Sequence, residues 1–521
     1  MKAHLMYRDR DLGPVLDPGL EPTAVTQALT QDLELSRLWA AMAAGDDFLA
    51  DLAQRVLLAS LTSPEEITYR QQILADAVAQ PAVVRQVYDI AVAAITGERK
   101  TFFGLMSKSP ESRLYRAAKV LEMFSGMLKQ LRSVADEHQA RFQSEGFRQF
   151  FAMITMELDD AYLQTVDDHL KELGFGNGTL ISASLGRGNK GTGYVLRELP
   201  GQGWRDRWSL GGKAGFSFTI ADHDETGQQA LADLRSRGLA GVASALAQAS
   251  DHILAFFTLL RAELAFYVGA LNLREALTAA GEPVCVPVPV AGEKLALTAR
   301  GLYDPSLSLR LTGRAVGNDV EADGKRLIMI TGANQGGKST FLRSVGLAQL
   351  MMQCGLFVAA ESFTASVSPG IFAHFKREED ATMKQGKLDE ELSRMADIAR
   401  QLTPGGLLLC NESFASTNEQ EGSEIGRQIV RALLESGVRV IFVTHLFDLA
   451  HSFYSAQADG ALQADGALQA DAALQADSAL FLRPERRDDG GRTFRLRPGE
   501  PLSTSYGPDL YQQIFRPGGS R

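Results

Sequence analysis

One segment of the chain combines glycines, a lysine and a hydroxyl at the spacing that binds phosphate. It fits the pattern G-x-x-x-x-G-K-S and reads Gly332-Ala333-Asn334-Gln335-Gly336-Gly337-Lys338-Ser339-Thr340. An apolar run over residues 326–331 predicts a strand before it, and the helical spacing after Thr340 predicts a helix, which is the setting this motif needs. Backbone N–H groups can turn around phosphates there, and the helix N-terminus adds positive charge. We expect a triphosphate to bind here, with Lys338 on the β- and γ-phosphates and Ser339 on Mg²⁺.

A second candidate pair follows another apolar run, over residues 406–410, which is typical of a strand buried on both faces. The run ends in Asn411-Glu412, where the usual first residue is an aspartate that holds Mg²⁺ or its waters. Asn411 offers a carbonyl oxygen without the charge, so we expect weaker metal binding and slow turnover. Glu412 is predicted to polarise the attacking water, and the alternative is an ordinary carboxylate at a strand end.

A third predicted strand, residues 438–443, ends in Thr444-His445. A histidine at this position can report the presence of the γ-phosphate, since its charge responds to nearby anions. The alternative is a structural histidine at the end of a strand.

The elements that must position these residues fall into five segments. Residues 1–32 form an N-terminal segment, residues 33–173 have helical spacing, and residues 174–220 are rich in glycine with short strands expected at 194–196 and 216–220. Helical spacing returns over 221–283. From 284 to 521 strands and helices alternate, which predicts an α/β domain with a largely parallel sheet. A good helix start is predicted at Ser63-Pro64, with a break near Pro81.

The overall composition limits the partners of the chain. Its 521 residues carry 53 Lys and Arg against 63 Asp and Glu, a net charge of −10, so the whole surface cannot attract polyanions. Residues 174–220 are the exception, because basic residues outnumber acidic ones there. The three cysteines lack metal-ligand spacing, and we find no signal peptide or membrane-spanning run, so we expect a cytoplasmic protein. A six-residue repeat over residues 456–480 predicts a surface loop.

Taken together, these motifs resemble the MutS family, a branch of the ABC-type ATPases. The resemblance covers residues 315–511 most strongly. It includes Asn318-Asp319, the TGANQGGKST loop, a helix start at 386–392 where the family has its signature helix, and Ser505-Tyr506-Gly507. Upstream, residues 58–67 with Arg70-Gln71 are similar to the family's core segment, where a helical lever begins.

The resemblance implies a multidomain fold. An all-α lever and core region with a small β-rich, clamp-like insertion at 174–220 would precede an α/β P-loop domain of ABC type. It also implies ATP and Mg²⁺ as cofactors, hydrolysis of ATP to ADP and phosphate, and a homodimer. Across that dimer Gly386, Lys387 and Glu391 would contact the ATP of the partner subunit.

DNA is the partner that the resemblance implies, in a repair or recombination process. The clamp-like insertion is expected to contact the DNA backbone through the basic residues Arg187, Lys190, Arg205 and Arg207, and the alternative is a solvated charged insertion. The family's mismatch-reading Phe-x-Glu motif is not found in the residues before the lever-like region, so recognition of mismatches is not expected. No membrane contact is expected.

A second hypothesis stays open at this point. The chain could be an ATP-gated scaffold with slow or negligible hydrolysis that acts on a protein or ribonucleoprotein partner. Asn411 and the net charge of −10 favour this alternative.

Overall fold

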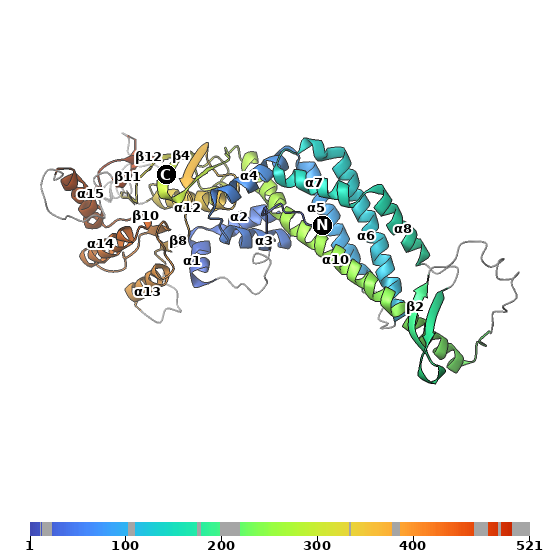
Figure 1. The fold of residues 1–521 in the computed structure, drawn as a ribbon. Coiled ribbons are helices and arrows are strands. Elements are labelled where there is room, and N and C mark those ends of the chain that lie inside the picture. Colours follow the sequence, from blue (N-terminus) through green and yellow to red (C-terminus); the bar gives the residue numbers. More distant parts are fainter. Residues whose placement is uncertain are drawn as a thin grey trace, which may run out of the picture. The chain divides into compact units, whose positions relative to one another are not determined.

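The computed structural model describes residues 1–10, 12, 23–102, 110–173, 179–197, 219–332, 335–377, 386–462, 478–487 and 491–502. The chain divides into two compact units (Figure 1): unit one contains residues 1–3 and 80–264, and unit two contains residues 4–79 and 265–521. The boundaries predicted at residues 33 and 284 therefore differ from the observed ones. Helical spacing shows which face of a helix is buried but not which neighbour buries it, so the sequence could not assign residues 4–79 to the P-loop unit.

Unit one is a set of helices with a small hairpin. The helices run alongside one another in Figure 1, and they are α5 (Pro81–Phe102), α6 (Pro110–His138), α7 (Glu145–Glu157), α8 (Asp160–Glu172) and the first part of α10 (Glu225–Ala279), with the short turn η2 (Gln139–Arg141). Aromatic contacts join them, such as Phe124 on α6 with Phe257 on α10, whose ring centroids are 5.9 Å apart. The helical spacing predicted over 33–173 and 221–283 is confirmed in the described residues, where the returning helix extends from Glu225 to Ala279.

The hairpin consists of β1 (Leu180–Leu185) and β2 (Gly191–Arg197), which are antiparallel, with the turn η3 (Arg187–Asn189) between them. Ile181 packs on α10 at Gly238, where a Cβ atom would lie 2.6 Å from Ile181 Cδ1, so a larger residue there would make the isoleucine shift. The strand predicted at 194–196 is confirmed. The strand predicted at 216–220 falls largely outside the described residues.

Helix α10 is the one helix in the described part of the chain that is long and apolar enough to cross a membrane by length and composition. Of its most apolar stretch, 67% is buried inside the protein, as expected for a core helix. No membrane-spanning run was expected from the sequence, whereas this helix passes the test of length and composition. The absence of membrane contact and the cytoplasmic location both stay predictions.

Unit two begins with helices α1 (Ala24–Asp32), α2 (Leu35–Ala43), α3 (Asp47–Leu58) and α4 (Pro64–Ala79). Ser63 caps α4 by accepting a hydrogen bond from Glu66 N at 3.3 Å, and Pro64 is its first residue. Helix α5 begins at Pro81. The predicted helix start and the predicted break are both confirmed. Proline is tolerated only in the first turn of a helix, so each of these two prolines marks where a helix begins.

The main sheet of unit two has six strands in the order β12-β11-β6-β10-β9-β8. Strands β11, β6, β10, β9 and β8 are parallel, and β12 pairs with β11 in the antiparallel direction. The strands are β6 (Leu327–Ile330), β8 (Ile371–Phe375), β9 (Leu407–Asn411), β10 (Arg439–Val443), β11 (Ala479–Arg486) and β12 (Arg492–Pro498), and the helices are α12 (Lys338–Gln353), α13 (Lys387–Ala399), α14 (Glu419–Glu435) and α15 (Phe447–Leu462). The predicted α/β domain with a largely parallel sheet is confirmed.

A second sheet has four strands in the order β3-β7-β4-β5. Its strands are β3 (Val288–Val290), β4 (Leu297–Leu302), β5 (Asn318–Glu321) and β7 (Ser362–Ser366), with the short helices η4 (Gly292–Lys294) and α11 (Pro305–Ser308). Through Asn318, β5 reaches β12 of the main sheet: Leu496 N donates to Asn318 Oδ1 at 2.7 Å.

The repeat at 456–480 differs from the predicted loop at both ends. Helix α15 continues to Leu462, and β11 begins at Ala479. Alanine, leucine and glutamine are strong helix formers, so the first repeat units extend the preceding helix. Residues 463–477 of the repeat lie outside the described part of the chain.

Candidate nucleotide-binding site

The parallel sheet brings the predicted site residues to one edge. Ile330, Val443, Asn411 and Phe375 stand in one row across β6, β10, β9 and β8. Strands β6, β10 and β9 are followed at that edge by residues singled out above, namely the P-loop, Thr444-His445 and Glu412. Glu412 N donates to Val443 O at 2.8 Å, which extends the ladder by one residue. Segments that are far apart in the sequence therefore meet at the carboxyl edge, where α/β sheets bind their ligands.

The P-loop needs glycine at two described positions. Gly332 has φ +117°, and a Cβ atom there would lie 2.8 Å from Pro484 Cδ on β11. Gly337 has φ +89°, and a Cβ atom there would lie 3.2 Å from Phe494 O on β12. At either position a residue other than glycine would have an unfavourable backbone φ, and its Cβ atom would crowd a neighbouring strand. Ala333 and Asn334 lie outside the described residues.

Lys338, the first residue of α12, is 4% exposed. Its Nζ donates to Gly332 O at 2.8 Å, so the amine lies over the phosphate-binding loop. Burial lowers the pKa of Lys338 to about 8, and the Glu412 carboxylate opposes this shift. Burial destabilises the charged form of an amine, and an anion bound beside it stabilises that form again.

Ser339 and Asn411, the two residues predicted to face the metal, are in direct contact. Ser339 Oγ donates to Asn411 Oδ1 at 2.8 Å, which joins the start of α12 to the end of β9. Hydroxyl and amide oxygens are ligands that Mg²⁺ accepts, usually together with water and phosphate oxygens. The pair therefore fits Mg²⁺ held on a bound triphosphate, although it supplies no negative charge of its own.

Glu412 lies next to His445, the other predicted catalytic residue. Glu412 Oε1 and His445 Nε2 are 3.0 Å apart, and the two side chains are 31% and 28% exposed. The imidazole is the main cause that lowers the pKa of Glu412, and Lys338 and Lys376 lower it further, while burial raises it. Glu412 is thus ionised at neutral pH and accessible to water, as a general base requires.

Strand β12 also contacts the P-loop, which the sequence did not predict. Asn318 Nδ2 donates to Phe494 O at 3.2 Å, and this backbone segment lies against Gly337. Arg492 on the same strand donates to Gln335 Oε1. The Phe494 side chain, at φ +58°, is 45% exposed beside the loop. The only signal in the sequence was Asn318, which was recognised as part of a motif without a stated partner.

The three residues predicted to touch the ATP of a partner subunit have different surroundings. Gly386 caps α13 and Lys387 begins it, and both are exposed. Glu391 is 5% exposed and accepts hydrogen bonds from Phe414 N at 3.0 Å and Ser416 Oγ at 2.9 Å. One turn along α13, the Glu391 side chain therefore faces the interior of its own chain, and its predicted contact with the ATP of a partner stays a prediction.

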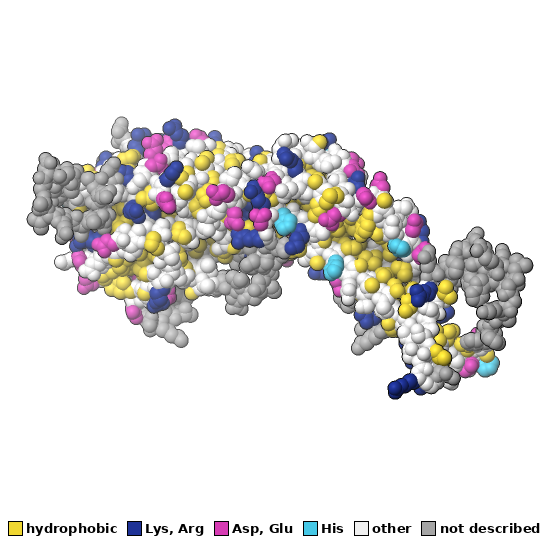
Figure 2. All heavy atoms as spheres, in the orientation of Figure 1, with side chains coloured by type: hydrophobic (Ala, Val, Ile, Leu, Met, Phe, Trp, Pro, Cys, Tyr) yellow, Lys and Arg dark blue, Asp and Glu magenta, His cyan; other side chains and the backbone are white. Residues whose placement is uncertain are grey.

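The predicted DNA contacts lie in unit one. Arg187 and Lys190 are exposed in the turn of the β1–β2 hairpin, which Gly186 N closes by donating to Lys190 O at 2.8 Å. Arg205 and Arg207 lie outside the described residues. On the face shown in Figure 2, basic and acidic side chains are interspersed, so attraction of an anion there depends on local groups.

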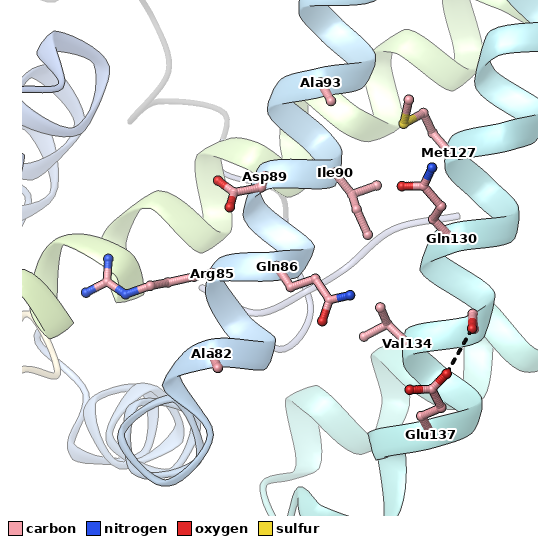
Figure 3. A pocket seen from close by; sticks show the side chains of 11 residues that line it. Ala82, Arg85, Gln86, Asp89, Ile90, Ala93, Met127, Gln130, Val134 and Glu137 are labelled. Atoms are coloured by element: carbon pink, nitrogen blue, oxygen red, sulfur yellow. Dashed lines mark hydrogen bonds between the residues drawn. The ribbon is translucent and has the colours of Figure 1, made fainter.

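A groove of about 640 Å³ lies between α5 and α6 of unit one (Figure 3). Gln86 on α5 and Gln130 on α6 point into the space between the helices, and Arg85 points away from it. Ser133 donates to Glu137 Oε1 at 3.2 Å along α6. None of the predicted site residues lines this groove.

Comparison with known proteins agrees with this geometry. Residues 62–280 match the family model described as the MutS2 N-terminal domain, and residues 328–481 match MutS domain V. The second match contains Lys338, Ser339, Asn411, Glu412 and His445. The described P-loop setting is therefore the one found in that domain.

Individual relatives match over shorter stretches. Endonuclease MutS2 of Thermus thermophilus is 32% identical over 183 residues, 35% of this chain and 24% of the relative. Endonuclease MutS2 of Thermomicrobium roseum is 35% identical over 170 residues, 32% of this chain and 21% of the relative. The DNA mismatch repair protein MutS of Thermotoga sp. (strain RQ2) is 37% identical over 141 residues, 27% of this chain and 18% of the relative.

The matched part of the chain thus spans about a quarter or less of the length of these relatives. The two family models nevertheless match separate regions of the chain in the order helical segment, then P-loop domain. On this ground the chain belongs to the MutS family and is similar to its MutS2 members.

Proposed function

We propose that the protein is a Mg²⁺-dependent ATPase of the MutS type that acts on DNA. One observation carries the proposal: the Ser339–Asn411 hydrogen bond and the Glu412–His445 pair lie at the same sheet edge as the P-loop lysine. A phosphate loop, a pair of oxygen ligands for a metal and a carboxylate for water are the groups that hydrolysis of a triphosphate needs.

Each of these residues has a role that follows from its surroundings. Lys338 and the backbone N–H groups after Gly332 would hold the β- and γ-phosphates. Ser339 and Asn411 would face the metal, which when bound neutralises charge on the phosphate oxygens. Glu412, ionised and partly exposed, would orient a water molecule and accept its proton.

His445 is proposed to hold the Glu412 carboxylate in place and to respond to the γ-phosphate. At 3.0 Å, the imidazole stabilises the ionised form of Glu412. A phosphate group bound close to this pair would compete with Glu412 for the imidazole, which would change how firmly His445 holds the carboxylate. This couples the state of the nucleotide to the catalytic carboxylate.

The neutral side chain of Asn411 favours slow hydrolysis of ATP. In the usual arrangement an aspartate at this position adds a negative charge beside the metal, whereas the amide oxygen of Asn411 supplies only a dipole. We therefore propose that the protein needs more Mg²⁺ than an aspartate-containing relative and turns over slowly.

DNA is the proposed partner of unit one. Two of the relatives are named as an endonuclease and a DNA mismatch repair protein, and the exposed turn with Arg187 and Lys190 offers positive charge for a phosphate backbone. We further propose a homodimer in which the exposed start of α13, with Gly386 and Lys387, faces the ATP of the other subunit. ATP-driven closure of this dimer would move the helices of unit one around DNA.

The second candidate is an ATP-gated scaffold that binds a protein or ribonucleoprotein. The neutral side chain of Asn411 beside Ser339 favours it, because a weakly held metal slows hydrolysis more than it weakens nucleotide binding. In this case ATP binding alone would change the conformation of the chain.

Phosphate release measured with and without Mg²⁺ and duplex, branched or single-stranded DNA separates the two candidates. The ATPase proposal expects Mg²⁺-dependent release that DNA stimulates and that Lys338→Ala abolishes together with nucleotide binding. Lys294→Ala is the matched control, because Lys294 is an exposed lysine in the short helix η4, between β3 and β4. Nucleotide binding without release above the Lys338→Ala background would instead support the scaffold.

A further inference from the structure

The loop that follows Glu412 is held by a buried carboxylate from another element. Glu391 on α13 is 5% exposed, and its two oxygens accept from Phe414 N at 3.0 Å and from Ser416 Oγ at 2.9 Å. A buried carboxylate must satisfy its hydrogen bonds to remain stable, so these two contacts fix the loop firmly against α13.

This loop has a backbone that needs such support. Glu412 has φ +53° and Phe414 has φ +65°, and both are non-glycine residues in the left-handed region. Residues held in this region persist only where the surrounding structure imposes the conformation. The direction in which the Glu412 side chain leaves the sheet edge therefore depends on what holds residues 413–416.

A second contact leads from the same part of α13 to the same loop. His374 on β8 is fully buried, and its Nδ1 lies 2.7 Å from Ser413 Oγ while its Nε2 lies 3.1 Å from Glu391 O. Burial lowers the pKa of His374 to about 4, with Arg394 acting in the same direction, so the ring is neutral. A neutral ring has one N–H, which must be at Nε2, because Glu391 O can only accept. Ser413 Oγ lies between Nδ1 and the backbone oxygen of His374, to which its hydroxyl also donates at 2.8 Å, so both contacts tie the loop to β8.

We propose that Glu391 and His374 are positioning residues that hold the loop of Glu412 and make the placement of this carboxylate depend on helix α13. The inference rests on the proposed ATPase function and assigns a regulatory role within the same site. Glu391 lies one turn after the exposed start of α13, so a shift of α13 on contact with another molecule is transmitted through Glu391 to Phe414 and Glu412.

Substitutions at Glu391 test the role directly. Glu391→Ala removes both acceptors, and it should lower the rate of single-turnover ATP hydrolysis by about 10- to 100-fold while the Kd for the nucleotide stays the same. Glu391→Gln keeps one acceptor for Phe414 N and offers an N–H to Ser416 Oγ, so it should retain most of the activity. Glu435→Ala and Glu435→Gln are the matched controls, because Glu435 is an exposed acidic residue at the end of a different helix, α14.

A double-mutant cycle separates positioning from a general loss of stability. In a Glu412→Gln background, Glu391→Ala should cause no further loss of rate, because no catalytic carboxylate remains to be positioned. Additive losses would overturn the proposal. So would a Glu391→Gln enzyme as slow as Glu391→Ala, since the negative charge rather than the hydrogen-bond geometry would then be responsible.

Hydrogen exchange gives a readout that does not depend on hydrolysis. The Phe414 amide should exchange faster in Glu391→Ala than in the wild type, and at the wild-type rate in Glu391→Gln. Ser416→Ala is a milder variant for the case that Glu391→Ala does not fold, and it should cause a smaller loss of rate in the same direction. If the Phe414 amide exchanges at the same rate in Glu391→Ala and in the wild type, the proposal is contradicted. If the wild type does not hydrolyse ATP but Glu391→Ala still speeds exchange at Phe414, only the proposed ATPase function is contradicted.

Discussion

Glu412 Oε1 lies 3.0 Å from His445 Nε2, at the ends of the adjacent strands β9 and β10. Asn411 and Val443 stand opposite each other in the parallel ladder, so Glu412 and the segment Thr444-His445 leave the sheet at the same edge. Lys338 lies close enough to lower the pKa of the same carboxylate. Glu412 is therefore the point at which the three predicted active-site segments meet.

Replacing Glu412 by glutamine should slow ATP hydrolysis by about 10²- to 10⁴-fold, since the group that accepts the proton from water is lost. Nucleotide binding should remain, because Lys338 and the P-loop backbone are unchanged. Single-turnover hydrolysis and nucleotide titration measure the two effects separately. Glu435→Gln, at an exposed position at the end of α14, is the control. A variant that hydrolyses ATP at the wild-type rate would remove Glu412 from the mechanism.

Nucleotide affinity should decrease as the pH rises above about 8. Lys338 has a pKa of about 8 in the nucleotide-free protein, against an ordinary value of 10.5, and a bound phosphate raises it. Below about pH 8 the amine is already charged, so its state does not affect binding. Above this pH, binding requires the uptake of a proton, and the affinity falls by at most about tenfold for each pH unit.

Calorimetry in buffers of different ionisation enthalpy measures this proton uptake directly. Lys338→Arg is the informative control, because its guanidinium keeps the positive charge throughout this range. The pH dependence above about 8 should disappear in this variant if it still binds nucleotide. An equal pH dependence in both proteins would show that another group is responsible.

Replacing Asn411 by aspartate should strengthen Mg²⁺ binding. The new carboxylate can still accept from Ser339 Oγ, and it adds a negative charge beside the metal position, so the Mg²⁺ concentration for half-maximal hydrolysis should fall by about tenfold. A Mg²⁺ titration of phosphate release measures this. Asn418→Asp makes the same change at the N-cap of α14, where aspartate caps equally well, and should have no effect. Equal Mg²⁺ requirements in Asn411→Asp and the wild type would contradict the role given to Asn411.

Neutralising Arg187 and Lys190 together should weaken DNA binding and reduce its salt dependence. If each contacts one phosphate, the slope of log K against log salt should decrease by about 1.8 in magnitude for duplex DNA. Fluorescence anisotropy at several salt concentrations measures the slope. Arg148→Ala with Lys171→Ala removes the same charge from exposed positions on α7 and α8 and is the control. An unchanged slope in the hairpin variant would exclude these two residues from the DNA contact.

Local features of the fold could be predicted from the sequence. The P-loop, the strands that end at Ile330, Asn411 and Val443, and the start of α4 at Pro64 are all specified by residues close together in the chain. Glycine conformations, caps and apolar runs act over a few residues, so their effect does not depend on distant contacts. Ser339 and Asn411 could each be predicted to face the metal, because one is the hydroxyl of the phosphate-binding motif and the other ends an apolar strand.

Contacts between distant segments were decided only by the tertiary structure. No local pattern shows that Glu391 turns inward to bond Phe414 and Ser416, that Phe494 lies against Gly337, or that residues 4–79 pack with the P-loop unit. A helical residue one turn from an exposed position can face solvent or core, and only the packing of neighbouring elements determines which. Thus the chemical groups were evident in the sequence, whereas the elements that hold them in place emerged only from the folded chain.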